Sequence, residues 1–167
     1  MWKKHPLLIA VPLWALDQAT KWIAEHRINF EGPPFEHPVI PGFFYLVHWG
    51  NTGAAFSMFR DNNLPFIALS VATFAGLLIA WSRGIFREPL YRWGIGLLLG
   101  GILGNLTDRL TRHHVVDFLV FNLHVPHADP WPAFNVADSC ICVAVGLFFI
   151  AGFQEEKRKA APQPAQS

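Results

Sequence analysis

The sequence predicts an all-α membrane protein with four transmembrane helices, a small extracytoplasmic β-sheet that forms a cradle, and a short surface helix or loop. The first observation is the composition, because 52% of the residues are hydrophobic and only 15% are charged. The second is that the apolar residues form four long runs, each close to the roughly 20 residues that a helix needs to cross about 30 Å of hydrocarbon. The third is a segment rich in β-branched and aromatic residues after the first run.

Residues 1–167 are expected to form a single integral membrane domain. The predicted spans cover about residues 7–25, 64–82, 91–110 and 134–153, and the outer loops cover residues 26–63 and 111–133. The first run is expected to remain as an anchor, because it is too long for a cleaved signal peptide. Residues 156–167 are charged and then rich in Ala, Pro and Gln, so this tail is expected to be disordered.

Basic residues flank the predicted spans unequally, and this predicts the orientation of the chain. One set of span ends carries Lys3, Lys4, Arg83, Arg87, Arg92, Lys157, Arg158 and Lys159, whereas the opposite set carries Arg27, Arg60 and Arg112. Because basic residues accumulate on the cytoplasmic side of membrane proteins, both termini are expected to be cytoplasmic. The formal net charge of +1, without clustered Lys and Arg, argues against a nucleic-acid partner.

Two outer segments are expected to be extended. Residues 38–48 contain Val, Ile, Phe, Tyr and Leu between turn signals, which favours short strands at the membrane surface, and residues 115–121 have a similar composition. The third span instead carries Gly96, Gly100 and Gly104 at a four-residue spacing, with Gly101 beside them. Small residues at this spacing predict a close approach of neighbouring helices.

The predicted topology brings polar residues from separate spans to the outer side of the membrane. These residues are Asp17, Gln18, Thr20 and Lys21 in the first span, Asn105, Asp108 and Arg109 in the third, Asn135 and Asp138 in the fourth, and Asn51 and Thr52 in the adjoining loop. Ionisable groups at this depth are costly when they face lipid. They are therefore expected to face one another across a polar cleft near the outer leaflet.

Four of these charged residues are expected to form ion pairs. Asp17 and Lys21 lie four positions apart on one helix face, which predicts a direct pair. Asp108 and Arg109 are adjacent and so do not face each other on a helix. Their charges still invite pairing at the helix end, and the alternative is that each has another partner.

Asp117 and Asp138 are the candidates for chemistry. Asp117 lies among apolar residues in an extended segment, and Asp138 lies in the first turn of the fourth span, where the helix dipole favours an ionised carboxylate. Two carboxylates brought close together can share one proton, which allows peptide hydrolysis without a covalent intermediate. The alternative is that both are buried acids satisfied by Asn and backbone donors, and the residues alone leave this open.

Five strings of the sequence match, in order, the motifs of a known family. They are Asp17-Gln18-Ala19-Thr20-Lys21, Asn51-Thr52-Gly53-Ala54-Ala55-Phe56, Gly100-Gly101-Ile102-Leu103-Gly104-Asn105 with Asp108-Arg109, Val115-Val116-Asp117-Phe118, and Phe134-Asn135-Val136-Ala137-Asp138. The chain thereby resembles the bacterial lipoprotein signal peptidases (signal peptidase II) over nearly its whole length. Members often have glycine shortly before the Val-Val-Asp-Phe string, whereas this chain has His113 and His114, so the backbone leading into Asp117 is expected to differ locally.

The resemblance implies an aspartyl endopeptidase that removes signal peptides from prolipoproteins, cutting before a cysteine that carries a diacylglyceryl group. It implies Asp117 and Asp138 as catalytic residues, and substrate-binding or supporting roles for Asp17, Lys21, Asn51, Gly53, Asn105, Arg109, Asn135 and Ala137. It implies no metal and no organic cofactor. The implied location is the bacterial cytoplasmic (inner) membrane with the active site near the periplasmic surface, and we expect a monomer in contact with membrane lipid.

Three rival functions fit parts of the sequence. A transporter or proton pathway also has intramembrane carboxylates, but it would spread them across the membrane, whereas these cluster in the outer half. A zinc hydrolase could use His113, His114, His124 and His127, but these lack a helical His-Glu-x-x-His pattern. A non-catalytic assembly factor would function without the two aspartate carboxylates.

Overall fold

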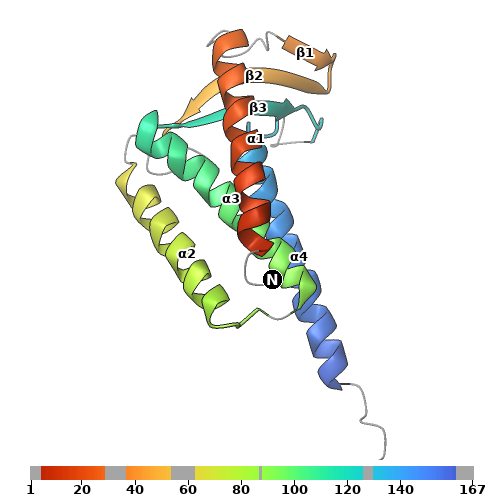
Figure 1. Ribbon diagram of the computed structural model, residues 1–167. Coiled ribbons are helices and arrows are strands. Elements are labelled where there is room, and N and C mark those ends of the chain that lie inside the picture. Colours follow the sequence, from red (N-terminus) through yellow and green to blue (C-terminus); the bar gives the residue numbers. More distant parts are fainter. Residues whose placement is uncertain (1–4, 29–36, 54–62, 87, 126–129, 161–167) are drawn as a thin grey trace, which may run out of the picture.

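Long helices that run side by side carry a small sheet at one end of the molecule (Figure 1). The structure is a computed structural model that describes residues 5–28, 37–53, 63–86, 88–125 and 130–160. Its elements, in chain order, are α1 (His5–Arg27), β1 (His37–Ile40), β2 (Phe44–Asn51), α2 (Leu64–Ser82), α3 (Pro89–Thr111), β3 (Val115–Phe121) and α4 (Val136–Ala160). The four predicted spans are thus helices, and both predicted extended segments are strands.

The sheet is antiparallel in the order β1-β2-β3, with residues far apart in sequence as neighbours. Trp49 pairs with Asp117 and Asn51 pairs with Val115, with an irregularity in β2 between Leu46 and Trp49. An isolated bridge between Leu119 and Phe134 ties β3 to the chain entering α4. The sheet therefore brings the end of β2, the middle of β3 and the start of α4 together. Residues 122–125 and 130–133 follow β3 as a partly exposed loop, which leads through Phe134 to the buried Asn135.

Glycines allow α3 to lie very close to α1 and α4. A side chain on Gly96 would meet Ile9 of α1, and a Cβ on Gly100 would lie 3.0 Å from the Ala10 carbonyl oxygen. On the other side, a Cβ on Gly101 would lie 2.5 Å from the Ala137 carbonyl oxygen of α4. The predicted close helix approach is confirmed.

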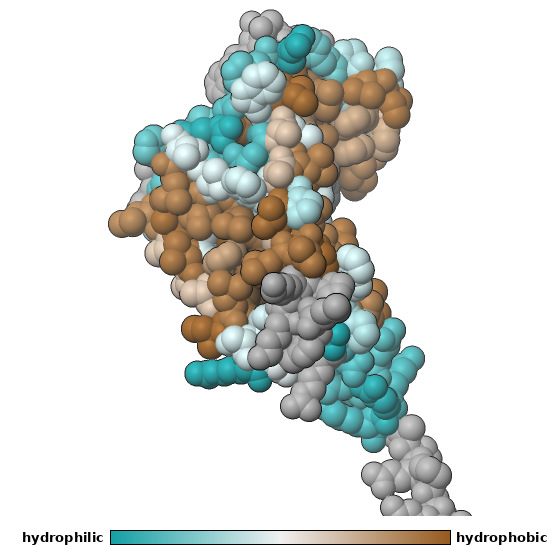
Figure 2. Space-filling view, in the orientation of Figure 1, coloured by the Kyte–Doolittle hydropathy of each residue, from teal (hydrophilic) through white to brown (hydrophobic). Residues whose placement is uncertain are grey.

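The outer surface supports a membrane protein, although the helices differ in how apolar they are. Within the described residues, Leu64–Ser82 and Val136–Lys159 are long and apolar enough to cross a membrane. Helices α1 and α3 carry charged side chains such as Lys21 and Asp108, which are buried inside the protein. Figure 2 shows an apolar surface over the middle of the helices and polar surface toward both ends. The protein is mostly helical with two clear apolar spans, so the prediction of four spans is only partly confirmed.

The predicted disorder of the tail is wrong as far as Ala160. Helix α4 continues through this segment, where Lys159 pairs with Glu155 at 2.8 Å and Arg158 pairs with Glu88 of the α2–α3 connection at 2.6 Å. An acidic residue four positions before a basic one stabilises a helix, and basic residues in the last turn favour its dipole. Residues 161–167 lie outside the described residues.

Replacing Gly101 with Ala is expected to destabilise the fold. The new Cβ would collide with the Ala137 backbone, and forcing extra atoms into packed interiors costs about 1–3 kcal/mol. Thermal unfolding of the purified protein in detergent should show a lower midpoint. Gly76→Ala in α2 is the matched control, because its Cβ would meet nothing within 4 Å. Equal midpoints for the two variants would contradict the packing argument.

Candidate active site

The ammonium group of Lys21 is the centre of a buried polar network. Its Nζ lies 2.9 Å from Asp17 Oδ2, 2.8 Å from Asp108 Oδ2 and 3.0 Å from Asn105 Oδ1. The side chains of Lys21, Asp17 and Asp108 are fully buried or nearly so. The predicted Asp17–Lys21 pair is confirmed, and Asp108 pairs with Lys21, so it has a partner other than the adjacent Arg109.

Both carboxylates that bind Lys21 also hold the backbone next to a candidate catalytic aspartate. Asp17 Oδ1 accepts a hydrogen bond of 2.9 Å from the backbone N–H of Ala137. Asp108 Oδ2 accepts one of 3.1 Å from the backbone N–H of Val116. Since Val116 precedes Asp117 and Ala137 precedes Asp138, the Lys21 network fixes the backbone next to both carboxylates.

Asparagine side chains hold the two carboxylates directly. Asn135 donates from Nδ2 to Asp117 Oδ1 at 2.8 Å, and its backbone N–H donates to Asp138 Oδ2 at 3.2 Å. Asn105 donates to Asp138 Oδ1 at 2.7 Å, and Asn51 donates to Asp117 Oδ2 at 2.9 Å. Asn135 therefore contacts both aspartates, and Asn105 connects Asp138 to Lys21.

The environment of Asp117 favours its protonated form. Burial, followed by the charge of Asp138, raises the pKa of Asp117 to about 7 from an ordinary value of 3.8. Hydrogen bonds from Asn51 and Asn135 and the charge of Lys21 act in the opposite direction. Near neutral pH, Asp117 therefore exchanges a proton readily, which is the property needed by one member of an acid–base pair.

Arg109 supports the site from a second side. Its Nη2 donates to the Gly53 carbonyl oxygen at 2.9 Å, its Nη1 donates to Asn63 Oδ1 at 2.6 Å, and its guanidinium lies 4.4 Å from the centre of the Phe66 ring. Gly53 in turn donates its N–H to Asn51 Oδ1 at 3.1 Å. Arg109 thus connects to Asp117 through the chain segment that carries Asn51.

Every candidate site residue predicted from the sequence lies in this connected network. These residues are Asp117, Asp138, Asp17, Lys21, Asn51, Gly53, Asn105, Arg109, Asn135 and Ala137. Both aspartates accept hydrogen bonds from asparagine side chains or backbone donors, as the alternative of satisfied buried acids predicted, and the same bonds hold the site residues in one arrangement. Their catalytic or binding roles are functional predictions that the geometry makes possible. Residues 54–56 of the matching string lie outside the described residues.

The site residues predicted from the sequence leave out three members of the network, although one of them, Gln18, was expected in the polar cleft. Gln18 donates to Asp108 Oδ1 at 2.9 Å, and Arg112 binds Glu25 at 2.8 Å, Asp108 at 2.9 Å and Gln18 at 3.0 Å. The four-residue spacing of Asp108 and Arg112 could have revealed this pair. Asn63, the third, carries no local sequence signal, because both of its side-chain partners come from residues about 50 positions away.

The turn before β3 shows how the chain accommodates histidine where the family often has glycine. His113 has a φ of +63°, in the left-handed region that glycine adopts most easily. The ring of His114 lies against Gly50 of β2. Within the described residues no group of three or more His, Cys, Asp or Glu side chains could hold a metal ion, and His127 lies outside them. The zinc alternative therefore has no support from this part of the chain.

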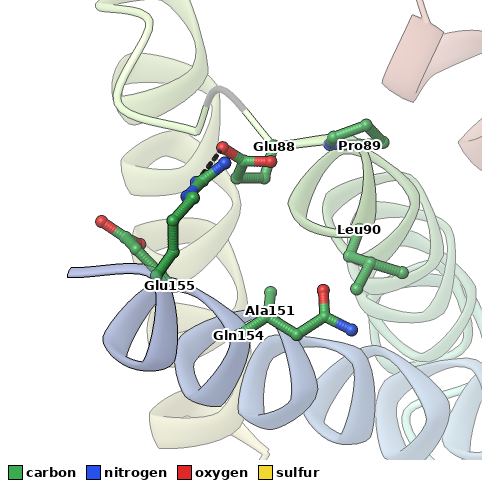
Figure 3. Close-up of a pocket in the computed structure, with 7 residues that line it drawn as sticks. Glu88, Pro89, Leu90, Ala151, Gln154 and Glu155 are labelled. Atoms are coloured by element: carbon green, nitrogen blue, oxygen red, sulfur yellow. Dashed lines mark hydrogen bonds and ion pairs between the residues drawn. The ribbon is translucent and has the colours of Figure 1, made fainter. Parts of the chain in front are cut away.

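A cavity of about 370 Å³ lies at the opposite end of the helices (Figure 3). It is lined by Glu88, Pro89, Leu90, Ala151, Gln154, Glu155 and Arg158. These residues lie near the beginning of α3 and the end of α4. Asp117 instead lies in β3, after the end of α3, and Asp138 lies at the start of α4. The cavity is therefore separate from the aspartate site, and the Glu88–Arg158 ion pair spans it.

The site and fold together define a class of protein. Two buried carboxylates, both bound by Asn135, lie at one end of a set of apolar helices. This arrangement is that of an aspartic-type peptidase in a membrane protein.

Comparison with known proteins identifies the family. The sequence profile described as signal peptidase (SPase) II matches residues 9–154. Two proteins named lipoprotein signal peptidase are 40% and 42% identical: that of Symbiobacterium thermophilum over 144 residues (86% of this chain, 91% of that protein), and that of Aeromonas hydrophila over 159 residues (92% and 90%). A solved structure described as a bacterial membrane enzyme gives a TM-score of 0.82 at 30% identity, covering 95% of this chain and 93% of that one. The chain belongs to the signal peptidase II family of aspartic-type peptidases.

Replacing Lys21 with Met is expected to destabilise the protein strongly. The substitution leaves Asp17 and Asp108 buried without their shared cation, and removing one partner of a buried ion pair costs about 3–5 kcal/mol. The free energy of unfolding in detergent is the measurement. Lys159→Met is the control, since the exposed Lys159–Glu155 pair should contribute far less to stability than the buried pair. A Lys21→Met protein as stable as the control would show that this network does not hold the helices together.

The raised pKa of Asp117 predicts a pH dependence of stability. The folded state binds this proton more tightly than the unfolded state, so the stabilisation is complete below about pH 4 and is lost as the pH rises through about 7. The unfolding midpoint of the wild type should therefore fall across this window relative to that of Asp117→Asn, which cannot titrate there. Parallel curves for the two proteins would mean that the Asp117 pKa is not raised.

Proposed function

We propose that this protein is an aspartyl endopeptidase that removes signal peptides from diacylglyceryl-modified prolipoproteins, cutting before the lipidated cysteine. The observation that carries the proposal is the double contact of Asn135, which binds Asp117 through its side chain and Asp138 through its backbone N–H. Relatives named lipoprotein signal peptidase support the substrate class. Asp117 and Asp138 are the catalytic residues in this proposal.

The reaction uses a water molecule between the two carboxylates. The ionised aspartate takes a proton from water as the water oxygen attacks the scissile carbonyl carbon, while the protonated aspartate donates a hydrogen bond to the carbonyl oxygen. Collapse of the tetrahedral intermediate breaks the C–N bond, and the leaving amine receives a proton from the aspartate pair. Asn51, Asn105 and Asn135 keep the carboxylates oriented throughout, because each donates to at least one of them.

The remaining predicted site residues have supporting roles in this proposal. Asp17 and Lys21 fix the backbone at Ala137 and the side chain of Asn105, while Arg109 fixes Gly53. Residues 51–53 then lie where a substrate peptide would approach Asp117. The substrate's acyl chains would remain in the bilayer, with the scissile bond at the membrane boundary.

In the proposed topology one membrane domain crosses the bacterial inner membrane four times, with both termini in the cytoplasm. The basic residues Arg83, Lys157, Arg158 and Lys159 lie at the helix ends opposite the aspartates, which agrees with a cytoplasmic position. The sheet and the aspartate pair then lie at the periplasmic surface. The protein acts as a monomer surrounded by lipid.

Asp117→Asn and Asp138→Asn should each abolish cleavage of a diacylglyceryl-modified prolipoprotein by the purified enzyme. An amide can neither take a proton from water nor supply the shared proton, so turnover should fall by roughly 1,000-fold or more. Glu156→Gln, at an exposed position of α4, is the control and should cleave normally. Unfolding midpoints measured in parallel verify that the variants are folded. Normal cleavage by either aspartate variant would rule out the proposed mechanism.

A further inference from the structure

Asn63 occupies a helix-capping position but uses its side chain elsewhere. It is the residue before α2, where asparagine usually accepts a hydrogen bond from the first turn of the helix. Its side chain makes no such cap. Instead, Oδ1 accepts from Arg109 Nη1 at 2.6 Å, and Nδ2 donates to the carbonyl oxygen of His113. Both halves of the amide are therefore directed toward α3 and the turn that follows it.

One contact of Asn63 leads to Asp117 through side chains. Arg109, which Asn63 binds, donates its other nitrogen to the Gly53 carbonyl oxygen. Gly53 donates to Asn51, and Asn51 donates to Asp117 Oδ2 at 2.9 Å. A shift of the Arg109 guanidinium would therefore alter the position of the Asn51 amide on the Asp117 carboxylate.

The other contact leads to Asp117 through the backbone. His113 has the left-handed conformation that turns the chain out of α3, and β3 starts two residues later at Val115. A non-glycine residue in this conformation is strained and persists only when its surroundings hold it. The Asn63 side chain supplies part of that support through the His113 carbonyl oxygen.

We propose that Asn63 is a positioning residue for the peptidase reaction, which fixes Arg109 and the His113 turn together and thereby sets where Asp117 stands relative to Asp138. This inference rests on the proposed function. The residue belongs to neither the predicted catalytic pair nor the predicted supporting residues. It links α2, which packs chiefly against α3, to the site (Figure 1).

The role predicts a change in kcat rather than in KM or stability. Asn63 reaches the carboxylates only by way of Arg109, Asn51 and the β3 backbone in the contacts described for it, so substrate affinity should be little affected. Because no helix cap is lost, the unfolding midpoint should also change little. A small displacement of a reacting group can lower the rate of the chemical step by roughly 10- to 100-fold.

Two variants separate the two contacts of the amide. Asn63→Ala removes both of them and should lower kcat for diacylglyceryl-modified prolipoprotein by roughly 10-fold or more at unchanged KM. Asn63→Asp keeps an acceptor for Arg109 and a residue suited to a helix N-cap, so it should fold, but it cannot donate to the His113 carbonyl oxygen. It should therefore also lower kcat. Leu64→Ala, at the neighbouring exposed position, is the matched control and should behave as the wild type.

The outcomes distinguish this inference from the proposed function. If the wild type and Leu64→Ala cleave and both Asn63 variants show lower kcat at unchanged KM, the positioning role is supported. Wild-type kcat in Asn63→Ala, or in a folded Asn63→Asp, would overturn it while leaving the peptidase assignment intact. A higher KM at unchanged kcat would also overturn it, because it would indicate substrate binding. A wild type that fails to cleave would instead overturn the proposed function.

Discussion

The burial of the Lys21 ammonium between two carboxylates is the constraint on which the rest of the structure depends. A buried charge is costly, and the cost is offset only when partners and hydrogen bonds surround it. Lys21 has Asp17, Asp108 and Asn105 around it, and Arg112 compensates the second carboxylate from the partly exposed side. This cluster fixes the position of α1 relative to α3. Asp17 also binds the backbone of α4 through its other oxygen, and Asp108 Oδ2, which contacts Lys21, also binds the backbone of β3.

The same constraint explains why the reactive pair can be maintained. Asp117 is nearly buried and lies close enough to feel the charge of Asp138, so both would favour protonation or separation if the chain could relax. The backbone hydrogen bonds at Val116 and Ala137 prevent this relaxation, because each holds the residue next to an aspartate. The hydrogen bonds that hold this region together are thus made in large part by the residues next to the aspartates. The buried position of Asp117 near the charge of Asp138 is maintained by neighbouring residues that take no part in the proposed chemistry.

Local periodicity explains which features could be predicted from the sequence. The Asp17–Lys21 pair, the small-residue face of α3 and the extended segments β2 and β3 all depend on residues within a few positions of one another. The contacts of Arg112 with Glu25 and Gln18 join residues 87 and 94 positions apart, and those of Asn63 join residues 46 and 50 apart, so they depend on the assembled fold. The last turns of α4 were predicted as disordered because their composition is polar, whereas ion pairs with Glu155 and Glu88 accompany the helix there.

The polar contacts around the aspartates form an inner and an outer layer, and the two layers have different physical roles. The inner layer around Lys21 is fully buried, so loss of a partner there affects folding before it affects catalysis. The outer layer, formed by Arg112, Asn63 and the His113 turn, is partly exposed and lies where α2 and β3 meet the end of α3. Water can replace a lost hydrogen bond in such a place at small cost in stability. A change in the outer layer can therefore move the aspartates while the helices remain folded. Substitutions in this layer can thus change the reaction rate without a comparable change in stability.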